Sequence, residues 1–274
     1  KNYAVKIDLL SRFRTPREQT DVVKRVKEGQ IDIVIGTHRL LSHDLRFFKL
    51  GLLVVDEEHR FGVTHKERIK KLKNLVDVVT LTETPIPRTL NIAINGIREL
   101  SIINTPPVDR LSVISYSCYF DDVTIRDAIL KELRRGGQIF FVHNRVQSIE
   151  KMTAQVAKIV PEARVRFGHG QMDAYELEDI MLAFMRHEFD VLVCSTIIES
   201  GLDIPNANTM VINRADTFGL AQLYQLRGRV GRSSRQAYCY LVLPSDELMT
   251  RKAKQRIAVI QKLTELGSGF KVAT

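Results

Sequence analysis

An apolar run at residues 52–55 is followed directly by three carboxylates and an imidazole: Asp56, Glu57, Glu58 and His59. Such a run predicts a buried strand, and open parallel sheets bind ligands at the carboxyl ends of their strands. Phosphoryl transfer depends mainly on positioning and charge neutralisation. We therefore expect Asp56 to hold Mg²⁺ through water and Glu57 to orient or deprotonate an attacking water. The alternative is a solvated acidic loop.

A metal-and-water site of this kind normally works beside a glycine-rich loop, G-x-x-x-x-G-K-[ST], whose backbone N–H groups and lysine hold the nucleotide phosphates. That pattern is absent from all 274 residues. The chain therefore has the features of one part of a nucleotide hydrolase, and we expect it to be inactive by itself. Because it starts at Lys1 and stops at residues 270–274 without a polar tail, we also expect both ends to be cut.

A second cluster, residues 222–232 (QLYQLRGRVGR), contains Arg227, Arg229 and Arg232 together with glycines that let the backbone approach a ligand closely. Guanidinium groups suit phosphate because they stay charged and bind two of its oxygens at once. Residues 217–245 contain no acidic side chain, so we expect the three arginines to await an external anion such as a γ-phosphate. The alternative is a basic surface turn.

The composition, 44% hydrophobic and 27% charged residues, is typical of a globular protein, and neither a membrane-length apolar run nor a signal-peptide pattern occurs. Cys118, Cys194 and Cys239 are far apart and lack C-x-x-C spacing, which argues against a disulfide framework or a zinc site. These features predict a cytoplasmic protein. The net charge of +9 predicts attraction to a polyanion, with nucleic acid as one candidate.

Ten short apolar runs alternate with amphipathic helical stretches, which predicts an α/β fold with parallel sheets covered by helices. The runs lie at residues 5–9, 31–35, 52–55, 78–81, 113–117, 139–142, 165–167, 191–194, 210–212 and 238–243. Two of them, 31–35 and 52–55, are dominated by Ile, Leu and Val, which predicts strands buried on both faces.

Two further patterns divide the chain. Residues 104–109 (NTPPVD) contain adjacent prolines and no periodicity, so we expect them to link two α/β units. Residues 121–135 have apolar positions at roughly helical spacing and end at Gly136 and Gly137, which predicts a helix that stops before the strand at 139–142.

Six strings occur in the order of the motifs of superfamily-two helicases and translocases, in which two RecA-like lobes sandwich ATP, and the chain resembles that superfamily along nearly its whole length. The strings that resemble motifs Ib to IV are residues 35–41 (IGTHRLL), 56–59 (DEEH), 81–90 (LTETPIPRTL) and 138–145 (QIFFVHNR). Residues 194–205 (CSTIIESGLDIP) resemble motif V, and residues 225–232 (QLRGRVGR) resemble motif VI.

Within that superfamily the chain resembles the bacterial transcription-repair coupling factors, through residues 56–63 (DEEHRFGV), 84–90 (TPIPRTL), 168–172 (GHGQM) and 218–223 (FGLAQL). Branched-DNA helicases that regress replication forks are the alternative, but Glu58, residues 11–14 (SRFR) and residues 266–270 (LGSGF) favour the coupling factors. The resemblance implies a bacterial cytoplasmic ATP-dependent translocase on double-stranded DNA that displaces stalled RNA polymerase and helps recruit excision repair. RNA polymerase and the damage-recognition protein would bind domains outside this chain.

The resemblance also implies roles for individual residues. The residues that would serve Mg²⁺, water and ATP are Asp56, Glu57, Arg229 and Arg232, with Gly201, Asp203 and Gln225 sensing or coupling nucleotide state and His59 linking the ATP and DNA sites. The residues that would contact the DNA backbone are Thr37, His38, Arg39, Asn144, Arg145, His169, Gly170 and Thr196. Phosphate contacts position a protein without reading sequence, so tracking along DNA would be sequence-independent.

Three departures from the family pattern limit these expectations: the phosphate loop is missing, Glu83 is unusual in motif III, and only the helical start of the translocation motif is present. Because the phosphate loop is missing, residues 1–107 would be the C-terminal part of the first lobe, followed by the second lobe at 108–245 and the start of a helical translocation motif at 246–274. Glu83 stands where motif III usually has a small residue, and a carboxylate close to other carboxylates raises their pKa values. We predict impaired coupling or hydrolysis, which Glu83→Ala in the full-length motor would relieve.

Two other classes of function stay open. The chain could be a DNA-binding module that docks DNA or a partner without turnover, or a degenerate structural domain. Binding driven by phosphate contacts weakens steeply as salt rises, whereas a structural domain would show no such binding.

Overall fold

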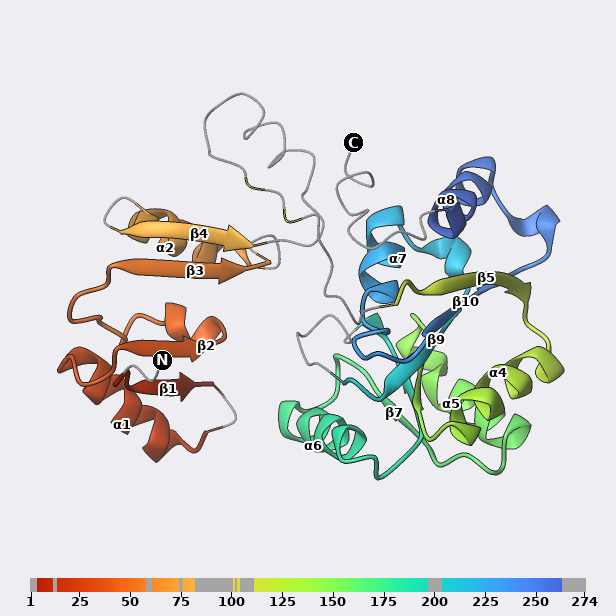
Figure 1. Cartoon of the computed structure of the whole chain (residues 1–274), viewed down its shortest axis with the longest axis horizontal. Coiled ribbons are helices and arrows are strands. Elements are labelled where there is room, and N and C mark those ends of the chain that lie inside the picture. Colours follow the sequence, from red (N-terminus) through yellow and green to blue (C-terminus); the bar gives the residue numbers. More distant parts are fainter. Residues whose placement is uncertain are drawn as a thin grey trace. The chain divides into compact units, whose positions relative to one another are not determined.

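The computed structural model describes residues 4–11, 14–57, 61–73, 76–81, 101, 103, 111–196 and 204–262 (Figure 1). The chain divides into two compact units, Lys1–Glu83 and Thr84–Thr274, and each is described by itself. The predicted linker at 104–109 and the predicted boundary after residue 107 lie outside the described residues, so both stay predictions.

The described residues of the first unit form four strands in two parallel pairs, β1–β2 and β3–β4, with Ile7 opposite Ile33 and Leu52 opposite Asp77. Its elements are β1 (Ile7–Leu10), α1 (Pro16–Lys27), β2 (Ile33–Gly36), the 3₁₀ turn η1 (His38–Leu41), β3 (Leu52–Asp56), α2 (Val63–Lys73) and β4 (Asp77–Leu81). Each of the four runs predicted here as a strand forms one, with bounds shifted by no more than two residues at either end.

Helix α1 starts where the chain provides a cap for its first turn. The Thr15 hydroxyl accepts from the backbone N–H of Glu18, whose carboxylate in turn accepts from the Thr15 N–H, and Pro16 occupies the first helical position. Val22 and Val26 on the inner face of the helix pack against Leu10 of β1. Capping and burial therefore fix the helix over the β1–β2 pair.

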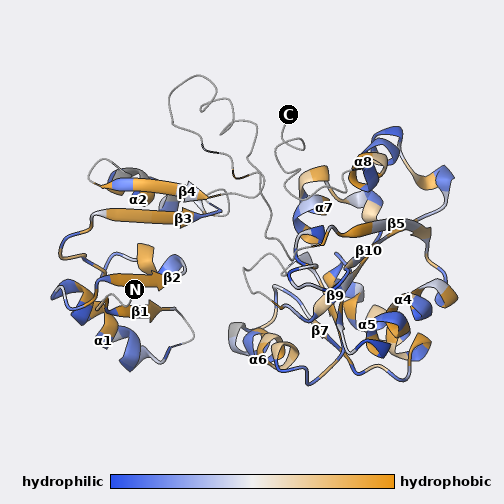
Figure 2. Ribbon diagram, viewed as in Figure 1, coloured by the Kyte–Doolittle hydropathy of each residue, from blue (hydrophilic) through white to orange (hydrophobic). Residues whose placement is uncertain are grey.

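The strands of the first unit are buried on one face only, so the prediction of burial on both faces is wrong in this structure. Alternate side chains stay exposed: Ile7 60%, Leu9 41%, Ile33 46%, Ile35 57%, Leu52 55%, Val54 55%, Val79 46% and Leu81 46%. Figure 2 shows how apolar these strands are. The physical reason is that α1 and α2 pack on the face that carries Leu10 and Val55, and no described residue covers the other face.

The second unit contains a six-stranded parallel sheet of order β5-β10-β9-β6-β8-β7. Its strands are β5 (Ile114–Tyr119), β6 (Gln138–Val142), β7 (Val165–Gly168), β8 (Val191–Cys194), β9 (Ala207–Asn213) and β10 (Tyr238–Leu243). Its helices are α4 (Asp122–Arg134), α5 (Ile149–Ile159), α6 (Ala174–Met185), α7 (Leu220–Arg227) and α8 (Arg251–Lys262), with 3₁₀ turns η3 (Val146–Ser148), η5 (Ala215–Thr217) and η6 (Asp246–Leu248).

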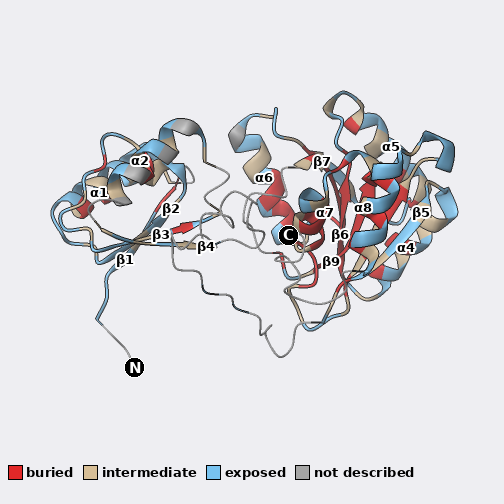
Figure 3. Cartoon of the chain, turned by 90° about the horizontal axis from the view of Figure 1, so that it is seen from above, coloured by how far each residue is buried: buried red, intermediate tan, exposed pale blue. Residues whose placement is uncertain are grey.

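Helices cover both faces of this sheet, so its central strands are buried throughout (Figure 3). Along β6, Phe140 and Val142 pack with α6, α7 and α8, whereas Ile139 and Phe141 pack with α4 and α5. This alternation confirms the predicted α/β fold of parallel strands between helices. Predicted helix 121–135 is α4, capped by the Asp121 side chain, which accepts from the Thr124 N–H at 2.9 Å.

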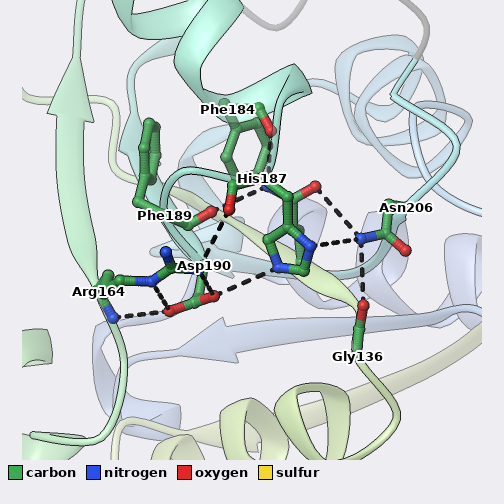
Figure 4. Close-up of polar contacts among 8 residues, drawn as sticks. Gly136, Arg164, Phe184, His187, Phe189, Asp190 and Asn206 are labelled. Carbon is green, nitrogen blue, oxygen red and sulfur yellow. Dashed lines mark hydrogen bonds and ion pairs between the residues drawn. The ribbon is translucent and has the colours of Figure 1, made fainter.

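A polar network holds the amino edge of this sheet, where strands β6 to β9 begin (Figure 4). Arg164 donates to both carboxylate oxygens of Asp190, at 3.0 and 2.8 Å, and its backbone N–H donates at 2.9 Å. His187 Nε2 lies 3.3 Å from Asp190, and His187 Nδ1 lies 3.3 Å from the Asn206 amide nitrogen, which also donates to the Gly136 carbonyl. Burial alone would raise the pKa of Asp190, but the hydrogen bonds from Arg164 outweigh it and lower that pKa.

Candidate functional site

The candidate hydrolytic carboxylates stand at the carboxyl edge of the β3–β4 pair. Asp56 ends β3 and is exposed, opposite Leu81 at the end of β4. Glu57 follows with φ +52°, a left-handed conformation that a residue other than glycine seldom adopts, and its N–H donates to the Leu81 carbonyl at 2.9 Å. The chain therefore bends at Glu57, which stays hydrogen-bonded to the end of β4.

These carboxylates fit a magnesium ion held in part by phosphate and water. Magnesium takes oxygen ligands and keeps several waters, so one or two protein carboxylates suffice. Among the described residues no group of three or more His, Cys, Asp or Glu side chains forms a metal cage. Asp56 is exposed at the strand end and can serve as such a ligand through water. Glu58 and His59 lie outside the described residues.

The predicted DNA-contacting residues Thr37, His38 and Arg39 follow β2 directly and open the turn η1. Gly36 before them has no room for a side chain, because a Cβ there would lie 2.1 Å from the Leu10 carbonyl oxygen of β1. The close approach of β1 and β2 at this position therefore requires glycine. Because η1 follows β2 directly, the turn lies at the carboxyl edge of the β1–β2 pair.

Arg39 is held by an internal carboxylate. Its guanidinium nitrogens donate to the two oxygens of Asp44 at 2.7 and 2.6 Å, and its Nε donates to Gln19 at 3.0 Å. Its hydrogen bond to Asp44 raises the pKa of Arg39, and the same contact lowers the pKa of Asp44. A DNA phosphate that bound Arg39 would have to share or displace Asp44, a competition that the sequence pattern did not reveal.

In the second unit the predicted DNA-contacting residues gather at the carboxyl edge of three neighbouring strands. Asn144 and Arg145 follow β6, Thr196 follows β8, and His169 and Gly170 follow β7. Asn144, Arg145 and Gly170 are exposed, and His169 and Thr196 are half-buried. Loops at one edge of a parallel sheet form the usual ligand-binding face of such folds.

His143 is a residue of this edge that the sequence analysis missed. It is buried, its Nε2 lies 2.8 Å from the Ser148 hydroxyl, and its Nδ1 lies 3.0 Å from the Asn213 amide nitrogen. Its backbone N–H donates to the Cys194 carbonyl at 2.7 Å. Burial and then nearby Arg145 lower the pKa of His143. His143 therefore fixes the start of the Asn144–Arg145 loop, and the only sequence signal for it was an imidazole directly after an apolar strand.

The three arginines of the 225–232 string have different environments. Arg227 is buried, lies 5.1 Å over the Tyr224 ring and donates to the Ile260 carbonyl of α8 at 2.9 Å. The expectation that Arg227 awaits an external anion is therefore wrong, because its partner is a backbone carbonyl 33 residues along the chain. Arg229 is 9% exposed, and Arg232 donates to the Gly228 carbonyl at 3.3 Å.

Two further residues of the 225–232 string, Gly231 and Gln225, are described by the structure. Gly231 has φ +74°, a conformation that favours glycine, and Gln225 is half-buried on α7. Phosphate contacts by Arg229, Arg232 and Gln225 stay predictions. Other predicted site residues lie outside the described residues: His59, Gly201 and Asp203, and with them the unusual Glu83 of motif III.

Among the described residues no helix has the length and apolar character needed to span a membrane.

Two known protein families match the chain. Residues 2–92 match the DEAD/DEAH box helicases, and residues 124–234 match the helicase conserved C-terminal domain. The first match covers most of the first compact unit and extends to residue 92, and the second match lies within the second unit. The match to the DEAD/DEAH box helicases implies nucleotide binding.

The chain is similar along its whole length to transcription-repair-coupling factors. It is 55% identical to that of Escherichia coli (strain K12) and 53% identical to that of Bacillus subtilis (strain 168), over 273 residues in each case. These alignments cover 100% of this chain but 24% and 23% of the relatives, so the chain spans about a quarter of their length.

Solved structures give the same fold. RecG bound to a three-way DNA junction is 36% identical with a TM-score of 0.77, over 99% of this chain and 36% of RecG. Saccharomyces cerevisiae Dbp5 bound to RNA and ADP BeF3 has a TM-score of 0.66 at 15% identity, over 95% of this chain and 68% of Dbp5, which shows the fold alone. By sequence and fold together, the chain is similar over its whole length to a segment of transcription-repair-coupling factors, and its two parts match two helicase families.

Proposed function

We propose that this chain is the motor part of an ATP-dependent double-stranded-DNA translocase that displaces stalled RNA polymerase and couples transcription to nucleotide excision repair. The observation that supports this best is 50–55% identity to transcription-repair-coupling factors over the full chain. Because the chain spans 24% or less of those proteins, the activity belongs to the longer protein. RNA polymerase and the damage-recognition protein would bind outside this chain.

In this proposal ATP hydrolysis depends on two carboxylates and two arginines. Asp56 holds Mg²⁺ through water, Glu57 orients the attacking water, and Arg229 and Arg232 neutralise charge on the triphosphate. The residues that respond to nucleotide state are Gly201, Asp203, Gln225 and His59. Bound Mg²⁺ supplies charge neutralisation, and the protein supplies the carboxylates and guanidinium groups that position the phosphates.

Movement along DNA depends in the proposal on backbone contacts. The contacting residues are Thr37, His38, Arg39, Asn144, Arg145, His169, Gly170 and Thr196. Support comes from their location: those of the first unit follow β2, and those of the second unit share one edge of the sheet. The chain's net charge of +9 favours binding to phosphate without regard to sequence.

The test compares DNA-stimulated ATP hydrolysis by this chain with that of a longer protein that includes the glycine-rich phosphate loop, each with and without Asp56→Ala. We expect only the longer protein to turn over, and Asp56→Ala to abolish its activity. Turnover that survives Asp56→Ala would refute the assigned role of Asp56. DNA binding without hydrolysis by either protein would favour a binding module or an inhibitory effect of Glu83.

A fork-regressing helicase is the second candidate, favoured by the structural match to RecG bound to a three-way DNA junction. Identity is lower for RecG, 36% against 55% for a transcription-repair-coupling factor. The two candidates differ in substrate. Displacement of a stalled RNA polymerase by the longer protein supports the first, whereas regression of a branched DNA without polymerase displacement supports the second.

A further inference from the structure

Three aromatic rings join two segments of the first unit that are far apart in sequence. The His38 ring lies 4.9 Å from the Phe61 ring and 5.1 Å from the His65 ring, and the Phe61 and His65 rings are 6.3 Å apart. The interplanar angles of 55° to 66° are those of edge-to-face and tilted pairs, which aromatic rings prefer to face-to-face stacking. His38 opens η1, whereas Phe61 and His65 belong to the segment after the carboxylates.

Phe61 also packs into the apolar cluster beneath β3. That cluster contains Val55, which precedes Asp56, together with Leu41 at the end of η1 and Ile69 of α2. Phe61 is half-buried, whereas His38 is exposed. One ring therefore touches the packed interior on one side and an exposed side chain of the turn on the other.

Phe61, which contacts His38, is also close in sequence to the candidate carboxylates. Phe61 lies four residues after Glu57, whose N–H is anchored to Leu81 at the end of β4. Phe61 also packs in the cluster of Val55, the residue before Asp56, so a shift at the end of β3 reaches His38 through ring contact. Packed interiors transmit such shifts because they have few voids to absorb them.

We propose that Phe61, supported by His65, is a positioning residue that couples the turn Thr37–Arg39 to the carboxylates Asp56 and Glu57. The proposal rests on the proposed function, in which the turn contacts DNA and the carboxylates serve hydrolysis. DNA binding at the turn and water activation at the carboxylates then influence each other in both directions, as two coupled sites must. Neither Phe61 nor His65 touches the nucleotide or the DNA in this role.

The experiment replaces Phe61 in the longer protein that contains the phosphate loop, using Phe61→Leu and Phe61→Tyr. Basal and DNA-stimulated ATP hydrolysis and duplex-DNA affinity are measured for each. Phe47→Leu is the matched control, because Phe47 is also half-buried in the first unit but packs in the separate cluster around Leu10. We expect Phe61→Leu to keep basal hydrolysis and lower DNA stimulation about tenfold. Phe61→Tyr, which retains a ring, restores stimulation.

A second readout uses this chain alone. Ring-current shifts of the His65 imidazole are followed by nuclear magnetic resonance while a short duplex is added. We expect the resonance to move in the unchanged chain and to move less in Phe61→Leu, in which only the direct contact between the His38 and His65 rings remains. An equal movement in both proteins overturns the inference. A melting temperature that matches Phe47→Leu shows that folding is intact.

The outcomes separate this inference from the proposed function. Equal DNA stimulation in Phe61→Leu and the unchanged protein overturns the inference alone. Loss of basal and stimulated hydrolysis by the same factor, as in Phe47→Leu, also overturns it, because it shows a purely structural role. Absence of DNA-stimulated hydrolysis in the unchanged longer protein overturns the proposed function, and the inference fails with it.

Discussion

Individual residues in this chain acquire their roles from partners that are close in space and often distant in sequence. Arg39 illustrates the point, because the resemblance assigns it to DNA while the structure pairs it with Asp44 in a two-pronged hydrogen bond. Exposed ion pairs contribute little to stability, typically about 0–1 kcal/mol. In the proposed function a DNA phosphate can take the place of Asp44 at Arg39, so Asp44 would modulate DNA affinity.

Asp44→Asn should strengthen duplex-DNA binding by this chain about two- to fivefold, because Arg39 no longer shares its charge with a carboxylate. Fluorescence anisotropy at fixed salt measures the change. Glu162→Gln is the matched control, since it removes the same charge from another exposed arginine pair, that with Arg126. Equal strengthening in both variants would show a general effect of net charge and contradict the specific role of Asp44.

Asp190 should make the second unit sensitive to acid. The pKa of Asp190 is lowered in the folded protein, so its contribution to stability is present above its unfolded pKa and is lost as pH falls through the folded pKa. Urea unfolding between neutral pH and about pH 3 should thus show a steeper loss for the unchanged chain than for Asp190→Asn. Identical pH profiles would exclude this linkage, and Asp173→Asn, an exposed helix cap, serves as control.

At the scale of elements, α8, the last helix among the described residues, is part of the second unit's core. Ala253, Ile257 and Ile260 of α8 are buried, the latter two in the cluster that also contains Leu223 and Leu226 of α7. Three polar contacts reinforce the packing: Arg227 to Ile260, Arg256 to the Asp216 carbonyl at 2.8 Å, and Gln261 to Ser117 at 3.0 Å. Helix α7, which precedes Arg229 and Arg232, therefore has a fixed partner in α8.

Arg227→Met should lower the free energy of unfolding of the second unit by about 1–3 kcal/mol, because the Ile260 carbonyl loses a charged donor in a buried place. Amide hydrogen exchange in α8 should accelerate at the same time. Arg186→Met is the control, since Arg186 is an exposed arginine whose side chain lies 3.8 Å from Glu188. Equal stability of the two variants would show that the Arg227 contact is not stabilising.

At the scale of the whole molecule, the two units differ in how completely their strands are buried. The second unit covers both faces of its sheet, whereas the first leaves one apolar face open among the described residues. Parallel sheets normally have both faces covered, and large exposed apolar patches favour association. The chain by itself should consequently self-associate as its concentration rises.

Ile35→Thr combined with Val54→Thr should reduce that self-association, because both side chains lie on the exposed face, at 57% and 55% exposure. Threonine keeps the β-branched shape that suits a strand. Light scattering over a concentration series measures the change. Val242→Thr, in the buried core of the second unit, is the contrasting control and should lower stability instead. A monomeric unchanged chain at all concentrations would contradict the prediction.

The pattern of apolar residues along the chain was sufficient to predict the strands of this fold. Each of the ten predicted apolar runs forms a strand, and 191–194 and 238–243 have the predicted bounds. The run at 210–212 is longer in the structure, Ala207–Asn213, because Asn208 and Thr209 are polar yet buried. A polar residue in a strand interrupts the apolar signal although its backbone still pairs with its neighbours.

The sequence by itself determined the α/β class, the strands and the string of motifs, because these depend on residues that are neighbours along the chain. Only the tertiary structure decided that one face of β1–β4 is open, that Asp44 holds Arg39, and that Arg227 turns inward to α8. Burial and partner choice depend on which distant segments meet. The residue types around Arg227 do not indicate that its side chain donates to a carbonyl 33 residues away.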